Sequence, residues 1–222
     1  MMVEFSDRSD AGKKLAAKLA TFGLTDPVVM ALPRGGVPVA AEIARALAAP
    51  LDLVIVRKLG APGQPELAAG ALVDGDPPDV VLNADIVQAC GLSDAALAQL
   101  VAHERLELER RRRAFGRARP VPVTGRTAIV VDDGAATGAS MKAAIRALRR
   151  RAPREVIVAI PAAPRETAAE LAAMADRLVC LEQPAPFLAL GHHYRDFPQL
   201  PDEEVIAILR QFEAPTPPER VR

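Results

Sequence analysis

The chain has 222 residues, of which 50% are hydrophobic and 25% are charged, a composition that suits one folded domain and excludes global disorder. Its 28 basic residues balance 28 acidic ones, so net charge gives no reason to expect nucleic-acid or membrane-surface binding. Two cysteines exclude a disulfide scaffold. Residues 1–8 lack a signal-peptide pattern and no apolar run is long enough to span a membrane, so we expect a cytoplasmic protein.

The first third of the sequence predicts one strand–helix–strand unit. An amphipathic helix is expected over residues 10–22, where Leu15, Leu19 and Phe22 recur at helical spacing. The elements expected next are a buried strand at 27–32, a helix at 37–47 and a second strand at 51–56. This spacing is typical of a parallel sheet, because neighbouring parallel strands need a crossover connection.

The middle of the chain is less regular. Residues 57–79 are rich in glycine and proline, and we predict loops around a short β segment at 67–73, with a further strand at 80–82. A long helix is expected at 94–119. Its arginine run, residues 110–113, follows glutamates at helical spacing, so a solvated face with ion pairs explains the run better than a nucleic-acid site.

Regular alternation returns after residue 122. The elements expected there are strands at 127–132, 155–160 and 177–181 and helices at 138–150, 164–175 and 202–212. We therefore predict an α/β fold: a doubly wound, mainly parallel sheet of about five core strands with flanking helices. A single domain would cover residues 1–213, with a loop and helical insertion at 59–120, a candidate hood segment at 184–200 and a frayed tail at 214–222.

The segment from Ala128 to Met141 carries the clearest chemical signal. A hydrophobic strand delivers two adjacent carboxylates, Asp132 and Asp133, and a run of small residues with Thr137 and Ser140 then leads into a helix. In an open α/β sheet, ligands bind at the edge formed by the carboxyl ends of the strands.

The loop after these acids suits a phosphate group. Small side chains let backbone N–H groups approach an anion, and the helix N-terminus and the two hydroxyls add to the attraction. The acids would then need other partners, such as sugar hydroxyls or a hydrated Mg²⁺. The segment has neither the Walker A lysine nor the G-x-G-x-x-G pattern. The alternative is an ordinary strand–turn–helix connection that uses aspartate as a cap and glycine for the turn.

The segment resembles the 5-phosphoribosyl-1-pyrophosphate (PRPP) motif of type I phosphoribosyltransferases: apolar residues, two acids, a few small residues and then Thr-Gly-x-Ser or Thr. Leu32-Pro33-Arg34-Gly35-Gly36 resembles the pyrophosphate loop of the same family, again between a strand and a helix. Residues 57–62, 65–71 and 193–197 resemble a subgroup of uncharacterised members. The resemblance extends along most of the chain and implies the fold of the family.

The resemblance also implies roles for individual residues. Asp132 and Asp133 would hold the ribose 2- and 3-hydroxyls, directly or through a metal-bound water. Arg34, with Gly35 and Gly36, would grip the pyrophosphate, often around a strained peptide bond in this family. The residues expected to wrap the 5-phosphate are Ala135, Ala136, Thr137, Gly138, Ala139 and Ser140, and Gly134 is also expected to bind substrate. Arg57 and Lys58 would neutralise pyrophosphate charge, and catalytic roles would fall to Asp132, Asp133, Arg34 and Lys58.

The implied activity is transfer of 5-phosphoribose from PRPP to an unidentified nitrogenous acceptor, with Mg²⁺ as cofactor and pyrophosphate as product. Departure of pyrophosphate leaves an oxocarbenium-like centre at C1, and a mobile hood from part of residues 59–78 would exclude water. Ala136 stands where purine-salvage members carry an acid, so the acceptor stays open. The main alternative is a PRPP- or nucleotide-sensing regulator of the same fold. A phosphatase fits less well because no nucleophile with an acid–base partner is recognisable. A homodimer is plausible by analogy only.

Aromatic and histidine residues near the C-terminus leave two alternatives open. His192 and His193 could contact a ligand, or they could be a solvated loop pair. Tyr194 and Phe197 could form an aromatic lid over a base, or they could pack the C-terminal segment onto the core.

Overall fold

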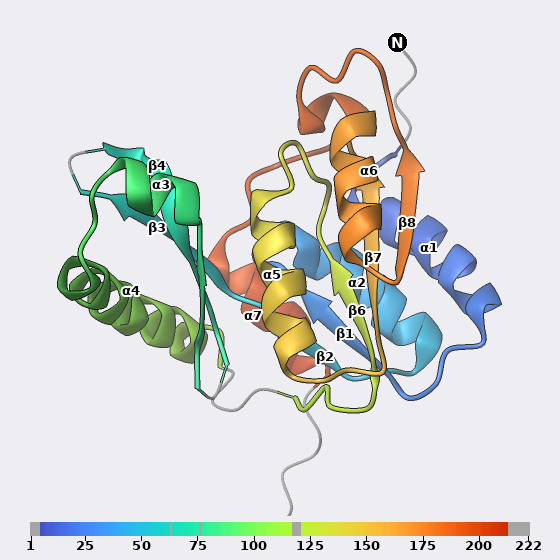
Figure 1. The fold of residues 1–222 in the computed structure, drawn as a ribbon. Coiled ribbons are helices and arrows are strands. Elements are labelled where there is room, and N and C mark those ends of the chain that lie inside the picture. Colours follow the sequence, from blue (N-terminus) through green and yellow to red (C-terminus); the bar gives the residue numbers. More distant parts are fainter. Residues whose placement is uncertain (1–4, 63, 76, 117–120, 213–222) are drawn as a thin grey trace, which may run out of the picture.

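The computed structural model describes residues 5–62, 64–75, 77–116 and 121–212, and it is built around a five-stranded sheet (Figure 1). The strands of this sheet are β1 (Pro27–Ala31), β2 (Leu51–Leu53), β6 (Thr127–Val131), β7 (Glu155–Ala162) and β8 (Arg177–Glu182). They are parallel and lie in the order β2-β1-β6-β7-β8. The predicted doubly wound α/β fold is confirmed.

Helices cover both faces of the sheet (Figure 1). The helices are α1 (Arg8–Leu19), α2 (Gly36–Leu47) and α7 (Asp202–Arg210) on one face and α5 (Ala139–Arg150) and α6 (Arg165–Met174) on the other. Successive strand residues point to opposite faces, so Val29 and Ile129 pack with the first group of helices and Val28 and Val130 with the second. Both faces are therefore buried, as the unbroken apolar runs of these strands predict.

The order of the strands reverses between β1 and β6. From β1 the chain crosses over α2 to β2, and from β6 it crosses over α5 to β7, in the opposite direction. The crevice at such a reversal is where open α/β sheets bind ligands. Residues 33–36 follow β1 and residues 132–138 follow β6, so the two loops singled out in the sequence meet at this crevice.

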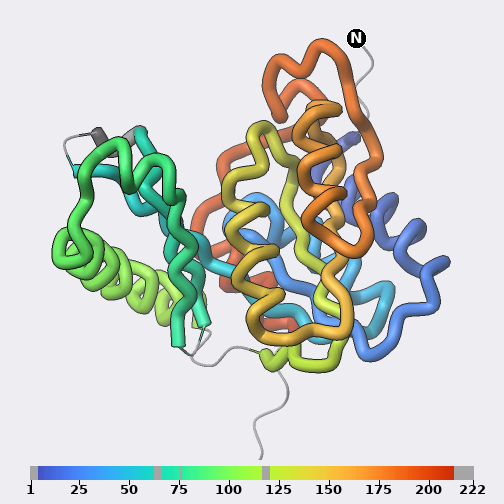
Figure 2. Tube along the Cα trace, viewed as in Figure 1, coloured from blue at the N-terminus to red at the C-terminus, as the bar shows by residue number. Residues whose placement is uncertain are grey.

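A second, antiparallel sheet forms the core of a smaller lobe, which we call the hood lobe (Figure 2). It consists of β3 (Val56–Ala61), β4 (Gln64–Val73), β5 (Asp79–Leu82), α3 (Ala84–Ala89) and α4 (Asp94–Ala114). The predicted β segment at 67–73 and the strand at 80–82 lie within β4 and β5, but β3 and the start of β4 were wrongly predicted as loop. The second predicted strand of the central sheet ends early, at Leu53. Register shifts at Leu59–Gly60 and Gly60–Ala61 interrupt the alternation of side chains that would have indicated a strand.

Two other predicted ends differ from the structure or lie beyond it. The long helix of the hood lobe ends at Ala114 rather than at 119. The expected tail at 214–222 lies outside the described residues, as do residues 117–120. Two short 3₁₀ helices complete the fold, η1 (Ala20–Phe22) and η2 (Leu190–His193). Across the described ranges, no helix has the length and apolar character that crossing a membrane requires.

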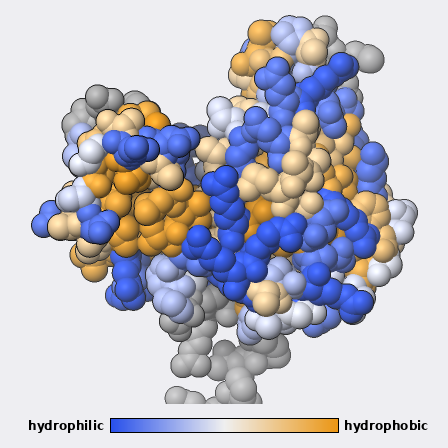
Figure 3. Space-filling model, in the orientation of Figure 1, coloured by the Kyte–Doolittle hydropathy of each residue, from blue (hydrophilic) through white to orange (hydrophobic). Residues whose placement is uncertain are grey.

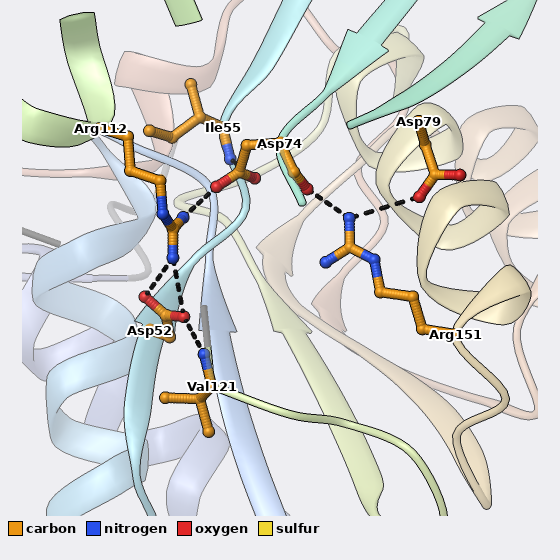
Figure 4. Close-up of polar contacts among 7 residues, drawn as sticks. All are labelled: Asp52, Ile55, Asp74, Asp79, Arg112, Val121 and Arg151. Carbon is orange, nitrogen blue, oxygen red and sulfur yellow. Dashed lines mark hydrogen bonds and ion pairs between the residues drawn. The ribbon is translucent and has the colours of Figure 1, made fainter. Parts of the chain in front are cut away.

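The hood lobe is joined to the central sheet by a buried charge cluster (Figure 4). Arg112 of α4 forms ion pairs with Asp52 of β2 and with Asp74, which follows β4. The backbone N–H of Val121 donates to Asp52 at 2.6 Å, and that of Ile55 donates to Asp74 at 2.7 Å. One guanidinium thus holds a carboxylate from the central sheet and one that follows the hood sheet. Burial raises the pKa of Asp74 to about 6, although the charge of Arg112 opposes this shift.

Asp74 makes the stability of the protein depend on pH. A folded-state pKa of about 6 exceeds the ordinary 3.8, so the folded state binds the proton more tightly and Asp74 opposes folding increasingly as pH rises from about 4 to 6. We expect the free energy of unfolding of the wild type to gain about 2 kcal/mol relative to Asp74→Asn between pH 7 and pH 4.5. Urea unfolding at both pH values measures this gain, and parallel profiles would contradict it.

Hydrophobic residues gather on the face of the hood lobe seen in Figure 3. Leu82 at the end of β5 is 44% exposed. Apolar surface of this kind on a small lobe beside a ligand crevice is typical of regions that contact a substrate or another protein.

Candidate functional site

The acid turn, residues 132–134, leaves the central sheet at the end of β6. Gly134 has a φ of 150°, a conformation that side chains rarely adopt, and a Cβ here would overlap Leu190 and lie 3.0 Å from the carbonyl oxygen of Ala162. The next backbone N–H, of Ala135, donates to the same carbonyl at 3.0 Å. The glycine therefore lets the turn pack against the end of β7 and the C-terminal segment.

The loop from Ala135 to Ser140 is open to solvent along most of its length. The side chains of Ala136, Thr137, Ala139 and Ser140 are exposed, and α5 begins directly behind them. Gly138, at φ 67°, makes the bend into the helix. The Thr167 hydroxyl of α6 donates to the carbonyl oxygen of Ala136 at 2.8 Å, which fixes the loop from outside. Small exposed residues at a helix N-terminus form a surface that can surround a phosphate.

The turn after β1 lies directly against the acid turn. Its Pro33–Arg34 peptide bond is cis. A Cβ on Gly36 would come within 2.6 Å of the carbonyl oxygen of Val131, and a Cβ on Gly35 would overlap the carboxylate of Asp133. The two glycines therefore allow a backbone approach that no other residue permits, and they bring Arg34 to the mouth of the crevice.

Gly35→Ala tests this close approach. The added methyl must displace the Asp133 carboxylate, so we expect a loss of about 1–3 kcal/mol in the free energy of unfolding and weaker binding of any ligand at the crevice. Gly23→Ala is the matched control: it strains a left-handed glycine at φ 60°, but its Cβ meets nothing within 4 Å. The control should lose stability and keep ligand affinity; equal losses of affinity would contradict the prediction.

Asp133 has a partner that the sequence did not reveal. The Nε of Arg8, in the first turn of α1, donates to its Oδ2 at 2.8 Å, and both side chains are about nine-tenths buried. Arg8 also donates to the carbonyl oxygen of Pro198 at 2.8 Å and lies 3.8 Å above the ring of Phe197. The two residues are 125 positions apart, and nothing in the local pattern around Arg8 distinguishes it from an ordinary helix start.

The surroundings make both acids harder to ionise. Loss of solvent raises the pKa of Asp132 well above its usual range, and the neighbouring charge of Asp133 raises it further. Loss of solvent also raises the pKa of Asp133, against the opposing effect of Arg8. A turn with carboxylates of this kind favours a ligand that supplies hydrogen-bond donors or positive charge.

The C-terminal segment packs over the acid turn. The Tyr194 hydroxyl donates to the carbonyl oxygen of Asp133 at 2.6 Å, and its ring stacks on Phe197 at 4.8 Å. Burial raises the pKa of Tyr194, so the hydroxyl stays protonated as a donor. His193 is buried and stacks on Phe187, while His192 is exposed. The structure therefore agrees with the core-packing alternative for Tyr194, rather than with an open aromatic lid.

A pocket of about 440 Å³ opens beside the acid turn. Its polar wall is formed by Arg8, Arg34, Gly35 and Asp133, and its other wall comes from the C-terminal segment. That second wall consists of Leu190, Phe197, Pro198, Gln199 and Leu200. The pocket combines two guanidiniums with apolar surface, which is the usual composition of a small-molecule site.

Arg57 and Lys58, which are expected to neutralise pyrophosphate charge, lie away from the acid turn. Both lie on β3 in the hood lobe, and Lys58 is exposed. Arg57 donates to Glu104 of α4 at 2.7–2.8 Å. The structure thus brings together Arg34, Gly35, Gly36, the acid turn and the loop to Ser140, whereas Arg57 is held by an acid of the hood lobe.

The oxygen donors of the acid turn suit a hard divalent cation. Mg²⁺ in proteins commonly keeps several waters and takes one or two carboxylates together with substrate phosphates. Asp132 is only partly buried and has no ion pair among the residues that the structure describes. Within those residues no cluster of three histidines, cysteines or acids could hold a metal without a substrate. The donor set therefore fits a Mg²⁺ ion that binds together with a phosphorylated ligand.

Comparison with known proteins identifies the family. Residues 7–189 match the model of the phosphoribosyl transferase domain. Two Mycobacterium tuberculosis proteins, named "Putative phosphoribosyl transferase" MT0597 and Rv0571c, are each 48% identical over 206 residues, which cover 92% of this chain and 46% of theirs. This chain therefore spans about half the length of the curated relatives it matches.

A solved structure extends the comparison to three dimensions. The crystal structure of TT1426 from Thermus thermophilus is 43% identical in sequence and has a TM-score of 0.83. The match covers 95% of this chain and 100% of TT1426. The family match over residues 7–189 includes the acid turn, the loop to Ser140 and the turn after β1. The chain belongs to the family of proteins with a phosphoribosyl transferase domain.

Proposed function

We propose that the protein transfers 5-phosphoribose from PRPP to a nitrogenous acceptor and releases pyrophosphate. The observation that carries this proposal is the meeting of two loops at the strand-order reversal. An acid pair with an open loop of small residues comes from β6, and the Arg34-Gly35-Gly36 turn comes from β1. One loop suits a sugar phosphate and the other suits a second anion beside it.

The proposed arrangement follows from charge. The loop of Thr137, Gly138 and Ser140 would hold the 5-phosphate at the start of α5, and the acid turn would accept hydrogen bonds from the ribose hydroxyls. Arg34, at the other side of the crevice, would stabilise negative charge that grows on departing pyrophosphate. Magnesium, when bound, would supply further neutralisation of that charge.

The hood lobe would complete the site by moving. Arg57 and Lys58 lie on β3, and Arg57 is now paired with Glu104. Closure of the hood lobe over bound PRPP would bring this strand toward the pyrophosphate and exclude water, which otherwise competes with the acceptor for C1. The pocket beside Phe197 offers the acceptor a mainly apolar wall.

The proposal is tested in two steps. Calorimetric titration with PRPP, with and without Mg²⁺, should detect binding that depends on the cation. A panel of nucleobases and other amines is then screened for pyrophosphate release at saturating PRPP. Failure to bind PRPP contradicts the proposal, whereas tight binding without turnover on any acceptor favours a PRPP-sensing regulator.

A further inference from the structure

Three segments distant in sequence converge on Asp133. Arg8 of α1 holds its carboxylate, Tyr194 holds its carbonyl oxygen, and Gly35 packs directly against its Oδ atoms. The N-terminal and C-terminal segments are themselves joined next to this point, by a parallel bridge between Phe5 and Tyr194. Asp133 is thus fixed at both its side chain and its backbone.

The contact between Arg8 and Asp133 is difficult to replace. It is a buried, charge-assisted hydrogen bond of 2.8 Å, and the guanidinium is further held by Pro198 and by the ring of Phe197. A sugar hydroxyl that took its place on Oδ2 would leave a buried guanidinium without its counter-charge, which is strongly unfavourable.

Asp132 differs from its neighbour in each of these respects. It is partly exposed, no ion pair reaches it in the described part of the chain, and the backbone N–H of Asp133 donates to its Oδ1 at 2.9 Å. That bond orients the side chain within the turn and leaves lone pairs for a ligand.

We infer that the two acids have different roles: Asp132 is the carboxylate that meets the ribose hydroxyls and the hydrated cation, whereas Asp133 anchors Arg8 and is not a ligand group. Arg8 is then a positioning residue, which acts by holding the acid turn against Gly35. The inference rests on the proposed function, because it assigns roles within the PRPP site.

A double variant that neutralises both Arg8 and Asp133 distinguishes an anchoring role of Asp133 from a ligand-binding role. We compare the wild type with Arg8→Gln, Arg8→Lys, Asp133→Asn, the double variant Arg8→Gln/Asp133→Asn, and Asp132→Asn in the wild-type and double-variant backgrounds. Mg²⁺-dependent PRPP affinity is measured by calorimetry, and Tm is measured for each protein. Each neutral single variant leaves one buried charge unpaired, so we expect PRPP affinity to fall by at least about tenfold.

The double variant should recover most of that loss, to within about threefold of the wild type, because Gln and Asn form a neutral hydrogen-bonded pair. Arg8→Lys keeps the charge and should retain more affinity than Arg8→Gln. Asp132→Asn should weaken binding by about a hundredfold or more in either background. If the double variant binds PRPP as weakly as Asp132→Asn, then Asp133 is itself a ligand group and the inference is overturned.

The same series distinguishes this failure from failure of the proposed function. A wild-type protein that does not bind PRPP contradicts the proposed function. In that case the Tm values test only the pairing of Arg8 with Asp133. A loss of Tm in the double variant that is smaller than the sum of the two single-variant losses supports the anchor, and strictly additive losses overturn it.

Discussion

Asp132→Asn is expected to weaken Mg²⁺-dependent binding of PRPP by about a hundredfold or more. The substitution keeps the shape of the side chain but removes the charge, which would serve charge-assisted hydrogen bonds to two hydroxyls or a cation's water shell. Bonds of that kind contribute about 1.5–3 kcal/mol each. Because the raised pKa of Asp132 means that its charge opposes folding at neutral pH, its neutralisation should not lower the free energy of unfolding.

Calorimetry with PRPP at saturating Mg²⁺ measures the effect, and urea unfolding checks the fold. Asp85→Asn is the matched control, since this exposed carboxylate lies on α3 of the hood lobe. It should leave PRPP affinity unchanged. A similar affinity in Asp132→Asn and wild type would remove this carboxylate from the proposed site.

Arg112→Met is expected to be the most destabilising single substitution among those considered. It removes the only guanidinium drawn between Asp52 and Asp74 in Figure 4 and leaves two buried carboxylates facing each other. Removal of one partner from a buried ion pair typically lowers the free energy of unfolding by about 3–5 kcal/mol. The variant should also loosen the hood lobe from the central sheet, since Asp52 belongs to β2 and Arg112 to α4.

Urea unfolding at pH 7 gives the size of the effect, and Arg110→Met is the control on the same helix. Arg110 is exposed and pairs with Glu107, so its replacement should change stability by less than about 1 kcal/mol. Adding Asp52→Asn and Asp74→Asn to Arg112→Met should restore part of the loss, because both stranded charges are then removed. A further decrease in stability on adding them would show that charge is not the cause.

The central fold and the acid turn could be predicted because their signals are local. A strand buried on both faces has a short unbroken apolar run, as at residues 127–131, and a turn that needs glycine or paired acids carries them in consecutive positions. Strand β3 of the hood sheet was missed because glycine and proline are frequent in residues 57–79 and the register shifts beside Gly60 interrupt the alternation of a strand.

The partners of the acid turn could not be predicted for a different reason. Arg8 reaches Asp133 across 125 positions of sequence, and Tyr194 reaches it across 61. Such contacts depend on how the termini pack after the sheet has formed, and a single sequence carries no record of them. The end of the second core strand was wrongly predicted: the strand expected at 51–56 ends at Leu53, and the chain turns into another sheet that carries Arg57.

The register of the two central strands has a consequence for how the protein folds. Val29 pairs with Leu51 on one side and with Ile129 on the other. The hood lobe lies in the sequence between these two partners, so the crevice forms only when a loop that contains the whole lobe has closed. Parallel pairings of this range are slow to form. The entropy of closing the loop, however, rises by only about 0.6 kcal/mol for each doubling of its length. A lobe of quite different size could therefore be carried between β2 and β6 at almost the same stability, with the two loops at the crevice left in place.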